Sequence, residues 1–167
     1  MAATPKGKEA LEALRTNEKK WSPEVMQAGW VAFPSILLEK QQAIGLTPTD
    51  VNIILYLLSY WWTAENKPYP SKASIAEAIG VEPRTVQRRI AALEKAGLMW
   101  REERRTSKHG SDTNRYHFDG LIEAAKRFAQ EKIALKNQQK AQKEQWQKKK
   151  RPDLRLVKDS SDNDVPV

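Results

Sequence analysis

The 167-residue chain contains no cysteine and only two histidines. Without thiols the protein can form neither disulfides nor thiolate-ligated zinc sites, which is typical of proteins that work in a reducing cytoplasm. The histidines, His109 and His117, lie eight residues apart with no cysteine near either. This pattern does not indicate a metal site, and we expect no metal and no other cofactor.

Long apolar runs are also missing. The N-terminal segment MAATPKGKEALEALR lacks the apolar region of a secretory signal. The longest apolar stretch, residues 51–62, is interrupted by polar side chains and is too short to span a bilayer. We therefore expect a cytoplasmic protein with no membrane partner.

The sequence has little that would support catalysis. It contains no glycine-rich loop for phosphates, no thiol nucleophile, and no cluster of carboxylates or histidines at catalytic spacing. Its Ser and Asp residues are scattered at helix starts and in the tail, where capping is a sufficient explanation for them. We do not expect an enzyme.

Positive charge is present, but it is unevenly distributed. The formal net charge is +8, and residues 121–158 carry twelve Lys and Arg against four Asp and Glu. Such an extension attracts nucleic-acid phosphates without regard to sequence. Its densest run is predicted to make non-specific phosphate contacts; it consists of Lys148, Lys149, Lys150 and Arg151.

Residues 70–97 form the segment around which the rest of the predicted fold is organised. Ile75, Ala76 and Ile79 give a short helix one apolar face, and Gly80 follows where the chain must turn. Pro83 suits the first turn of a second helix. Its apolar stripe recurs at i, i+4 and i+7 and consists of Val86, Ile90 and Leu93.

The opposite side of this second helix is basic and carries no acid between Glu82 and Glu94. Arg and Gln side chains hydrogen-bond base edges and phosphates, and a small residue allows close approach to a groove. A solvated face with no partner would more often mix Glu and Lys. The residues on or beside this side are Arg84, Thr85, Gln87, Arg88, Ala91 and Lys95.

The order of these residues resembles the bacterial helix-turn-helix signature. The matching positions are Ala76, Gly80, Val81, Thr85, Val86 and Arg88. Residues 33–121 are similar to winged helix-turn-helix proteins of plasmids, phages and other mobile elements. The resemblance implies a mainly α fold with a small β-hairpin wing, and double-stranded DNA as partner. Glu82 departs from the pattern, because the family often has Ser or Thr as the cap at this position.

Placed on that fold, the helix over residues 83–96 enters the major groove, and the hairpin over residues 98–118 lies on the flanking backbone or minor groove. Base reading is expected of Arg84, Gln87 and Arg88. Backbone contacts are expected of Ser71, Lys72, Thr85, Arg89 and Lys95. The wing residues are Arg104, Arg105, Lys108, His109 and Arg115.

The remaining elements follow from local patterns. Residues 25–33 predict a strand or irregular segment, and residues 35–44 a helix that Gly45 ends. Thr47 and Asp50 predict a capped helix start, with the core helix running on to the tryptophans at 61 and 62. Residues 98–104 and 114–118 alternate as half-buried strands, with Gly110 as the turn. Their predicted inner residues are Leu98, Trp100, Tyr116 and Phe118.

We divide the chain into an N-terminal arm (1–24, mobile or partly helical), a DNA-binding domain (25–120), a basic helix (121–151) and an acidic, disordered tail (152–167). Asp119 can cap the basic helix. Its apolar residues near heptad spacing favour a homodimer, although the helix could instead fold back on its own domain. These residues are Leu121, Ala124, Ala125, Phe128 and Leu135.

Three functions remain open. The first is a homodimeric, nucleoid-associated transcriptional regulator that binds an inverted repeat. The second is a plasmid or phage replication or maintenance protein that binds origin repeats and recruits a replication partner. The third is a winged-helix module for protein interaction that does not bind DNA.

Overall fold

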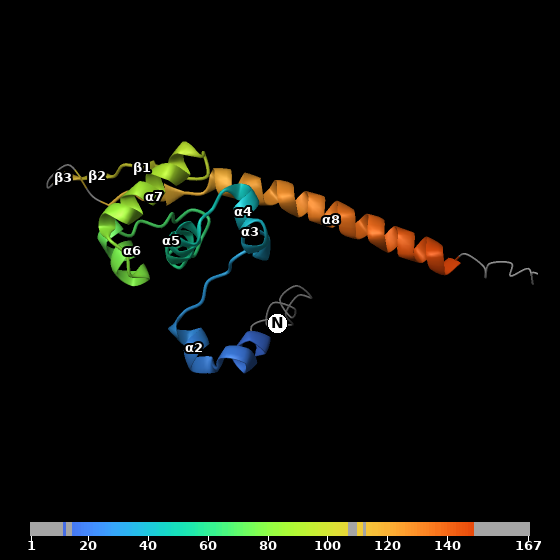
Figure 1. The fold of residues 1–167 in the computed structure, drawn as a ribbon. Helices are drawn as coiled ribbons and strands as arrows, with labels where there is room; N and C mark the ends of the chain where they lie inside the picture. The colour runs from blue at the N-terminus through green and yellow to red at the C-terminus, as the bar shows by residue number, and fades with distance from the viewer. Residues whose placement is uncertain (1–11, 13–14, 107–109, 112, 149–167) are drawn as a thin grey trace, which may run out of the picture. The chain divides into compact units, whose positions relative to one another are not determined.

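A computed structural model describes residues 12, 15–106, 110–111 and 113–148. It divides into two compact units, residues 1–129 and 130–167. The first unit is called the domain below, and Figure 1 labels most of the helices and strands. In chain order the elements are α2 (Pro23–Ala28), α3 (Ser35–Glu39), α4 (Gln41–Ile44), α5 (Pro48–Leu58), α6 (Lys72–Ile79), α7 (Pro83–Lys95), β1 (Trp100–Glu102), β2 (Arg105–Thr106), β3 (Gly110–Ser111), β4 (Arg115–His117) and α8 (Asp119–Lys148).

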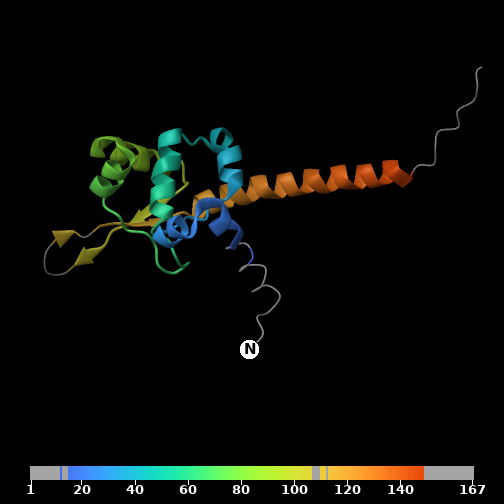
Figure 2. The same cartoon turned by 90° about the horizontal axis from the view of Figure 1, so that it is seen from below.

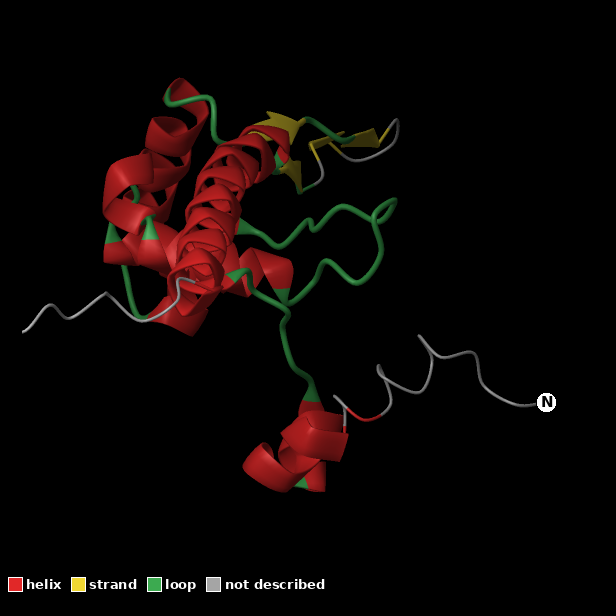
Figure 3. Ribbon diagram, turned by 90° about the vertical axis from the view of Figure 1, so that its right-hand side faces the viewer, coloured by secondary structure: helices red, strands yellow, loops and turns green. Residues whose placement is uncertain are grey.

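The predicted fold class is confirmed: the described chain is mainly helical, and its strands follow the two helices of the central motif (Figure 3). β1 pairs antiparallel with β4, and β2 pairs antiparallel with β3 further out (Figure 2). Gly110, predicted as the turn, instead lies in β3 opposite Thr106. Residues 107–109, which connect the two strands, lie outside the described residues.

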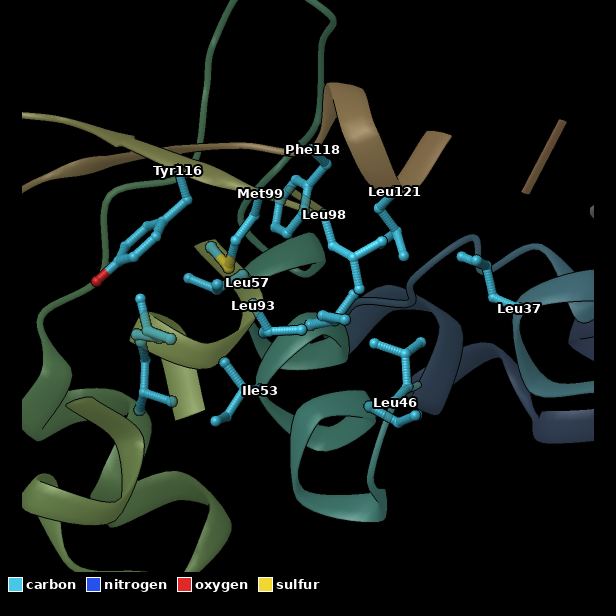
Figure 4. Packing of buried hydrophobic residues seen from close by; sticks show 14 of the residues in the cluster. Leu37, Leu46, Ile53, Leu57, Leu93, Leu98, Met99, Tyr116, Phe118 and Leu121 are labelled. Atoms are coloured by element: carbon cyan, nitrogen blue, oxygen red, sulfur yellow. The ribbon is translucent and has the colours of Figure 1, made fainter. Parts of the chain in front are cut away.

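The core of the domain is built around α5, α6 and α7 (Figure 4). The predicted inner residues of the hairpin, Tyr116 and Phe118, are each only 2% exposed. α5 packs against both α6 and α7, so its buried surface is wider than one stripe. This is why Ile53 and Leu57 are fully buried, whereas Leu55 and Leu58 are only partly buried.

The start of α5 holds the fully buried carboxylate of the domain. Thr47 Oγ1 accepts from the Asp50 backbone N at 3.3 Å, and Thr47 N donates to Asp50 Oδ2 at 2.7 Å, which confirms the predicted capping box. Arg89 of α7 donates from Nε to Asp50 Oδ1 at 2.8 Å and from Nη2 to Oδ2. A bidentate ion pair therefore joins the start of α5 to the middle of α7.

The N-terminal part of the domain contains more helix than predicted. Residues 15–21 are helical, and residues 25–28 belong to α2 and not to a strand. Ser22 caps α2, and Pro23 is pre-set for its first turn, a signal that the prediction overlooked. The helix predicted over 35–44 breaks at Lys40 into α3 and α4, and Gly45 ends α4 with a φ of 85°.

Trp100 was predicted to point inward, and this prediction is wrong. Its side chain is 48% exposed, stacks on the His117 ring at 3.7 Å, and donates from Nε1 to Asp119 Oδ2 at 3.0 Å. Leu98 and Met99 are both buried in its place. They precede β1, so the alternation of a strand does not apply to them.

The first turns of α8 pack on their own domain. Leu121 is buried, and Ala124, Ala125 and Phe128 pack against the same core, as the fold-back alternative predicted. The helix begins at Asp119, the residue that was predicted as its cap, and Leu121 N donates to Leu98 O at 2.8 Å. A Cβ on Gly120 would lie 1.8 Å from Gly97 O, so only glycine allows this close approach. Among the described helices, none is long and apolar enough to cross a membrane.

We expect Asp50→Asn to destabilise the domain by about 2–3 kcal/mol. Breaking a buried ion pair costs roughly 3–5 kcal/mol, and the cost here is smaller because the Arg89 side chain keeps 26% of its surface in water. Urea unfolding followed by circular dichroism measures the change. Glu123→Gln, at an exposed pair with Lys126, is the matched control and should change stability by less than about 0.5 kcal/mol. Equal effects of the two substitutions would contradict the role of Asp50.

The contribution of Asp50 should disappear in acid. Burial alone would raise the pKa of Asp50, but the hydrogen bonds from Arg89 and Thr47 outweigh it and hold that pKa below its ordinary value of 3.8. The stabilisation is therefore present above the pKa of the unfolded chain and is lost as pH falls through the lower folded pKa. Unfolding curves of wild type and Asp50→Asn should differ at neutral pH and converge at pH values below the ordinary pKa of Asp50. A constant difference down to the acid limit would rule this out.

Candidate nucleic-acid interface

α6 and α7 form two helices joined by a tight turn. The Ser71 side chain caps α6 by accepting from Ser74 N at 3.0 Å. Gly80 ends α6 in the left-handed region at φ 69°, and Val81 N donates to Ala76 O at 3.0 Å. Pro83 then opens α7. The caps and the turn thus set the angle at which α7 leaves α6.

α7 has one buried and one exposed side, as predicted. Val86 and Ile90 are 0% exposed and Leu93 is 3% exposed, so they hold the helix onto the core. Burying each such side chain stabilises the fold by roughly 1.5–3 kcal/mol. The side chains on the other side are exposed; they are Arg84, Gln87, Arg88, Ala91 and Lys95.

Most of the exposed residues of α7 line one concave surface with the start of α6. We call this surface the recognition face. It brings the three predicted base-reading residues together with two of the predicted backbone contacts, Lys72 and Thr85. Its lining consists of Lys72, Glu82, Pro83, Arg84, Thr85, Gln87, Arg88 and Ala91.

Two predicted backbone contacts have structural roles that the sequence analysis did not foresee. The fork of Arg89 is bound to Asp50, and this hydrogen bond raises the pKa of the guanidinium. The Ser71 hydroxyl caps α6 and lies 2.8 Å from the Ser74 hydroxyl. Neither residue is prevented from touching a phosphate, but both already serve the fold. Lys95, at the end of α7, does not line the recognition face.

A second bidentate pair fixes the hairpin on α7. Arg101 of β1 donates from Nε and Nη2 to the two carboxylate oxygens of Glu94, at 2.7 and 2.6 Å. The hydrogen bond to Glu94 raises the pKa of Arg101. Each side chain is 25% exposed, so the pair is partly shielded from water. It holds the first strand of the hairpin beside the end of the candidate recognition helix.

The structure describes part of the predicted wing. The Arg104 guanidinium lies over the Tyr69 ring at 5.0 Å, and Arg115 Nη1 lies 3.6 Å from Glu102 Oε1. The backbone of Arg105 is in β2. Lys108 and His109 lie outside the described residues. Of the predicted basic run, Lys148 is exposed at the end of α8, and Lys149, Lys150 and Arg151 lie outside the described residues.

The recognition face also contains an acid. Glu82 occupies the cap position of α7, but its side chain makes no capping hydrogen bond and is exposed. It therefore places a negative charge at the edge where a DNA phosphate would approach. Across the part of the chain that the structure describes, no group of three or more metal-ligating side chains gathers at one place.

Comparison with known families agrees with this geometry. Residues 45–99 match the model of a family described as a helix-turn-helix domain. The match spans α5, α6 and α7 and ends before β1, so it covers the recognition face but not the hairpin. No curated protein matches the chain. Residues 45–99 are thus similar to a helix-turn-helix domain, and this similarity supports DNA as a partner.

Replacing Glu82 should strengthen DNA binding. A unit charge about 4 Å from a phosphate costs roughly 1 kcal/mol in water, so Glu82→Gln is expected to lower the Kd for a duplex about fivefold at low salt. Fluorescence anisotropy with a labelled duplex at two salt concentrations measures this change.

Glu77→Gln is the control, because Glu77 is exposed on α6 but does not line the recognition face. It should leave the Kd nearly unchanged. Weaker binding by Glu82→Gln, or an equal gain from both variants, would argue against the recognition face as the DNA contact.

Proposed function

We propose that the protein is a sequence-specific regulator of transcription that binds double-stranded DNA. α7 enters the major groove, and the hairpin lies on the flanking backbone or minor groove. The observation that carries the proposal is the recognition face: Arg84, Gln87 and Arg88 share one concave surface on a helix whose other side is anchored in the core. These side chains have the donors and acceptors that base edges require.

The mechanism is occupancy of a site on DNA. Lys72 and Thr85 flank the base-reading residues and hold the phosphates that set the register of α7. Glu82 limits affinity for arbitrary duplexes, since every sequence presents the same phosphates to it. Discrimination then rests on the base contacts and less on the general attraction of the basic extension.

A homodimer on an inverted repeat would add specificity, because two half-sites are read at once. Leu121, Ala124, Ala125 and Phe128 are used by the core of their own domain. The dimer contact is therefore assigned to other side chains of α8. Ile133 and Leu135 are each more than half exposed and supply apolar surface for it.

The same exposed part of α8 favours a second candidate, an origin-binding protein for replication or maintenance of a mobile element. Its side chains over residues 130–148 are exposed and supply a surface for a replication partner. Tandem direct repeats as the bound site would favour this candidate, and a single palindrome would favour the regulator.

Arg88→Ala should relax base preference without abolishing binding. Loss of one bidentate arginine contact costs roughly 1–3 kcal/mol of discrimination at its base position. In vitro selection of bound duplexes, followed by sequencing, should show that position flattened in the resulting motif. An unchanged motif would remove Arg88 from the base-reading set.

Lys148→Ala is the contrasting variant, because Lys148 is exposed and lies far along the chain from the recognition face. It should weaken binding evenly across sequences and reduce the salt dependence of binding. If neither wild type nor variant shifts mixed duplexes in a gel at moderate salt, the protein is an interaction module and the proposal fails.

A further inference from the structure

A second concave surface lies beside the recognition face and is lined by aromatic rings. We call it the aromatic surface; its lining consists of Tyr60, Trp62, Tyr69, Pro70, Ser71, Ser74 and Thr113. Tyr60 is 50% exposed, Trp62 69% and Tyr69 57%. Three large rings that gather around one hollow and remain exposed are typical of a binding surface.

Two of the rings are held in place by their neighbours. The Tyr60 hydroxyl lies 3.1 Å from the Tyr56 hydroxyl, with the ring centroids 5.3 Å apart. This hydrogen bond raises the pKa of Tyr56 to about 12. The Arg104 guanidinium lies over the Tyr69 ring, 5.0 Å from the ring centroid. Rings that are already positioned lose little conformational freedom when a flat ligand stacks on them.

A basic hollow adjoins the aromatic surface and shares Tyr60 and Tyr69 with it. Three basic side chains and two acidic side chains line this hollow. One of the acids, Glu102, already lies 3.6 Å from Arg115 and 3.2 Å from His117. The cations are Lys67, Arg104 and Arg115, and the acids are Glu65 and Glu102.

The aromatic surface and the recognition face meet at the start of α6. Ser71 lines the former, and its neighbour Lys72 lines the latter. A DNA strand that leaves a duplex bound on the recognition face can therefore reach the aromatic surface. Rings next to cations match the pattern of an unpaired strand, in which flat bases alternate with phosphates. An apolar protein segment has no charged groups that could pair with Lys67, Arg104 and Arg115.

We propose that the aromatic surface binds unpaired nucleotides that flank the duplex. The bases stack on Tyr60, Trp62 and Tyr69, and Lys67, Arg104 and Arg115 hold the phosphates. Because every base has a flat face, this binding is tolerant of sequence. The proposal rests on the duplex binding proposed above, and it names a junction of duplex and single strand as the substrate.

The test measures the binding of labelled DNAs to the 167-residue chain by fluorescence anisotropy. One DNA is a blunt duplex. The others are the same duplex with an unpaired thymidine tail at one end of one strand; the tail has about ten nucleotides, within the roughly 4–16 nucleotides of known single-strand sites. We expect the best tailed duplex to bind at least about tenfold more tightly than the blunt one, as stacking of one or two bases would give.

Substitutions in the aromatic surface should remove this advantage and leave blunt-duplex binding intact. Trp62→Ala and Tyr69→Ala should each reduce it about fivefold or more, the lower end for loss of one base–aromatic stack. Trp62→Phe keeps a ring and should retain most of it. Trp146→Ala is the matched control, because Trp146 is 81% exposed on α8 and lies outside the aromatic surface.

The outcomes separate the two proposals. If blunt duplexes bind but tails add nothing, or if all variants keep the advantage, the aromatic surface does not hold nucleotides and the inference is overturned. If tailed and blunt duplexes both fail to bind, duplex binding itself is wrong. If the tailed duplex binds but the blunt duplex does not, and Arg88→Ala leaves this binding unchanged, the proposed regulator is wrong and the aromatic surface stands.

Discussion

The ion pair between the buried Asp50 carboxylate and Arg89 is the contact on which the candidate interface depends. Val86, Ile90 and Leu93 hold α7 against the core, but apolar side chains tolerate rotation of a helix about its axis better than directed bonds do. The fork of Arg89 on Asp50 removes that freedom. Asp50 in turn is fixed by Thr47, so the start of α5 sets which residues of α7 face outward. Removing Arg89 would leave the Asp50 charge buried and unpaired.

The pair between Arg101 and Glu94 repeats this arrangement at the other end of α7. It ties β1 to the last turn of the helix, while Tyr116 N donates to Pro68 O and ties β4 to the loop before α6. The hairpin is thus held on both of its strands, by groups that belong to the two helices of the motif or to the loop leading into it. A duplex in contact with α7 therefore meets a hairpin whose base is fixed, and the approach of the hairpin costs little further ordering.

Local signals predicted much of the fold. The Thr47 cap, the glycine at 80 and the i, i+4, i+7 stripe of α7 are properties of neighbouring residues, and all are confirmed. The start of α2 at Ser22 and Pro23 was a local signal that the prediction overlooked. Other failures involve contacts between distant residues. The pair of Asp50 and Arg89 spans 39 positions, and no periodicity reports it. Trp100 points outward because His117 and Asp119 offer it a stack and a hydrogen bond, which pairing of the strands creates. The recognition face was predictable as a set of residues, whereas the aromatic surface required the fold.

The two surfaces bear differently on function. A protein that only occupies a palindrome needs the recognition face and a second copy of the chain. Exposed aromatic rings beside that face would add only non-specific binding. A protein that holds an unpaired strand next to a duplex needs both surfaces, and their adjacency at Ser71 and Lys72 serves that purpose. Duplex opening is a step of origin function and not of simple repression. Binding of a junction would therefore favour the origin-binding candidate, because binding to intact duplex alone requires no base stacking on the three rings.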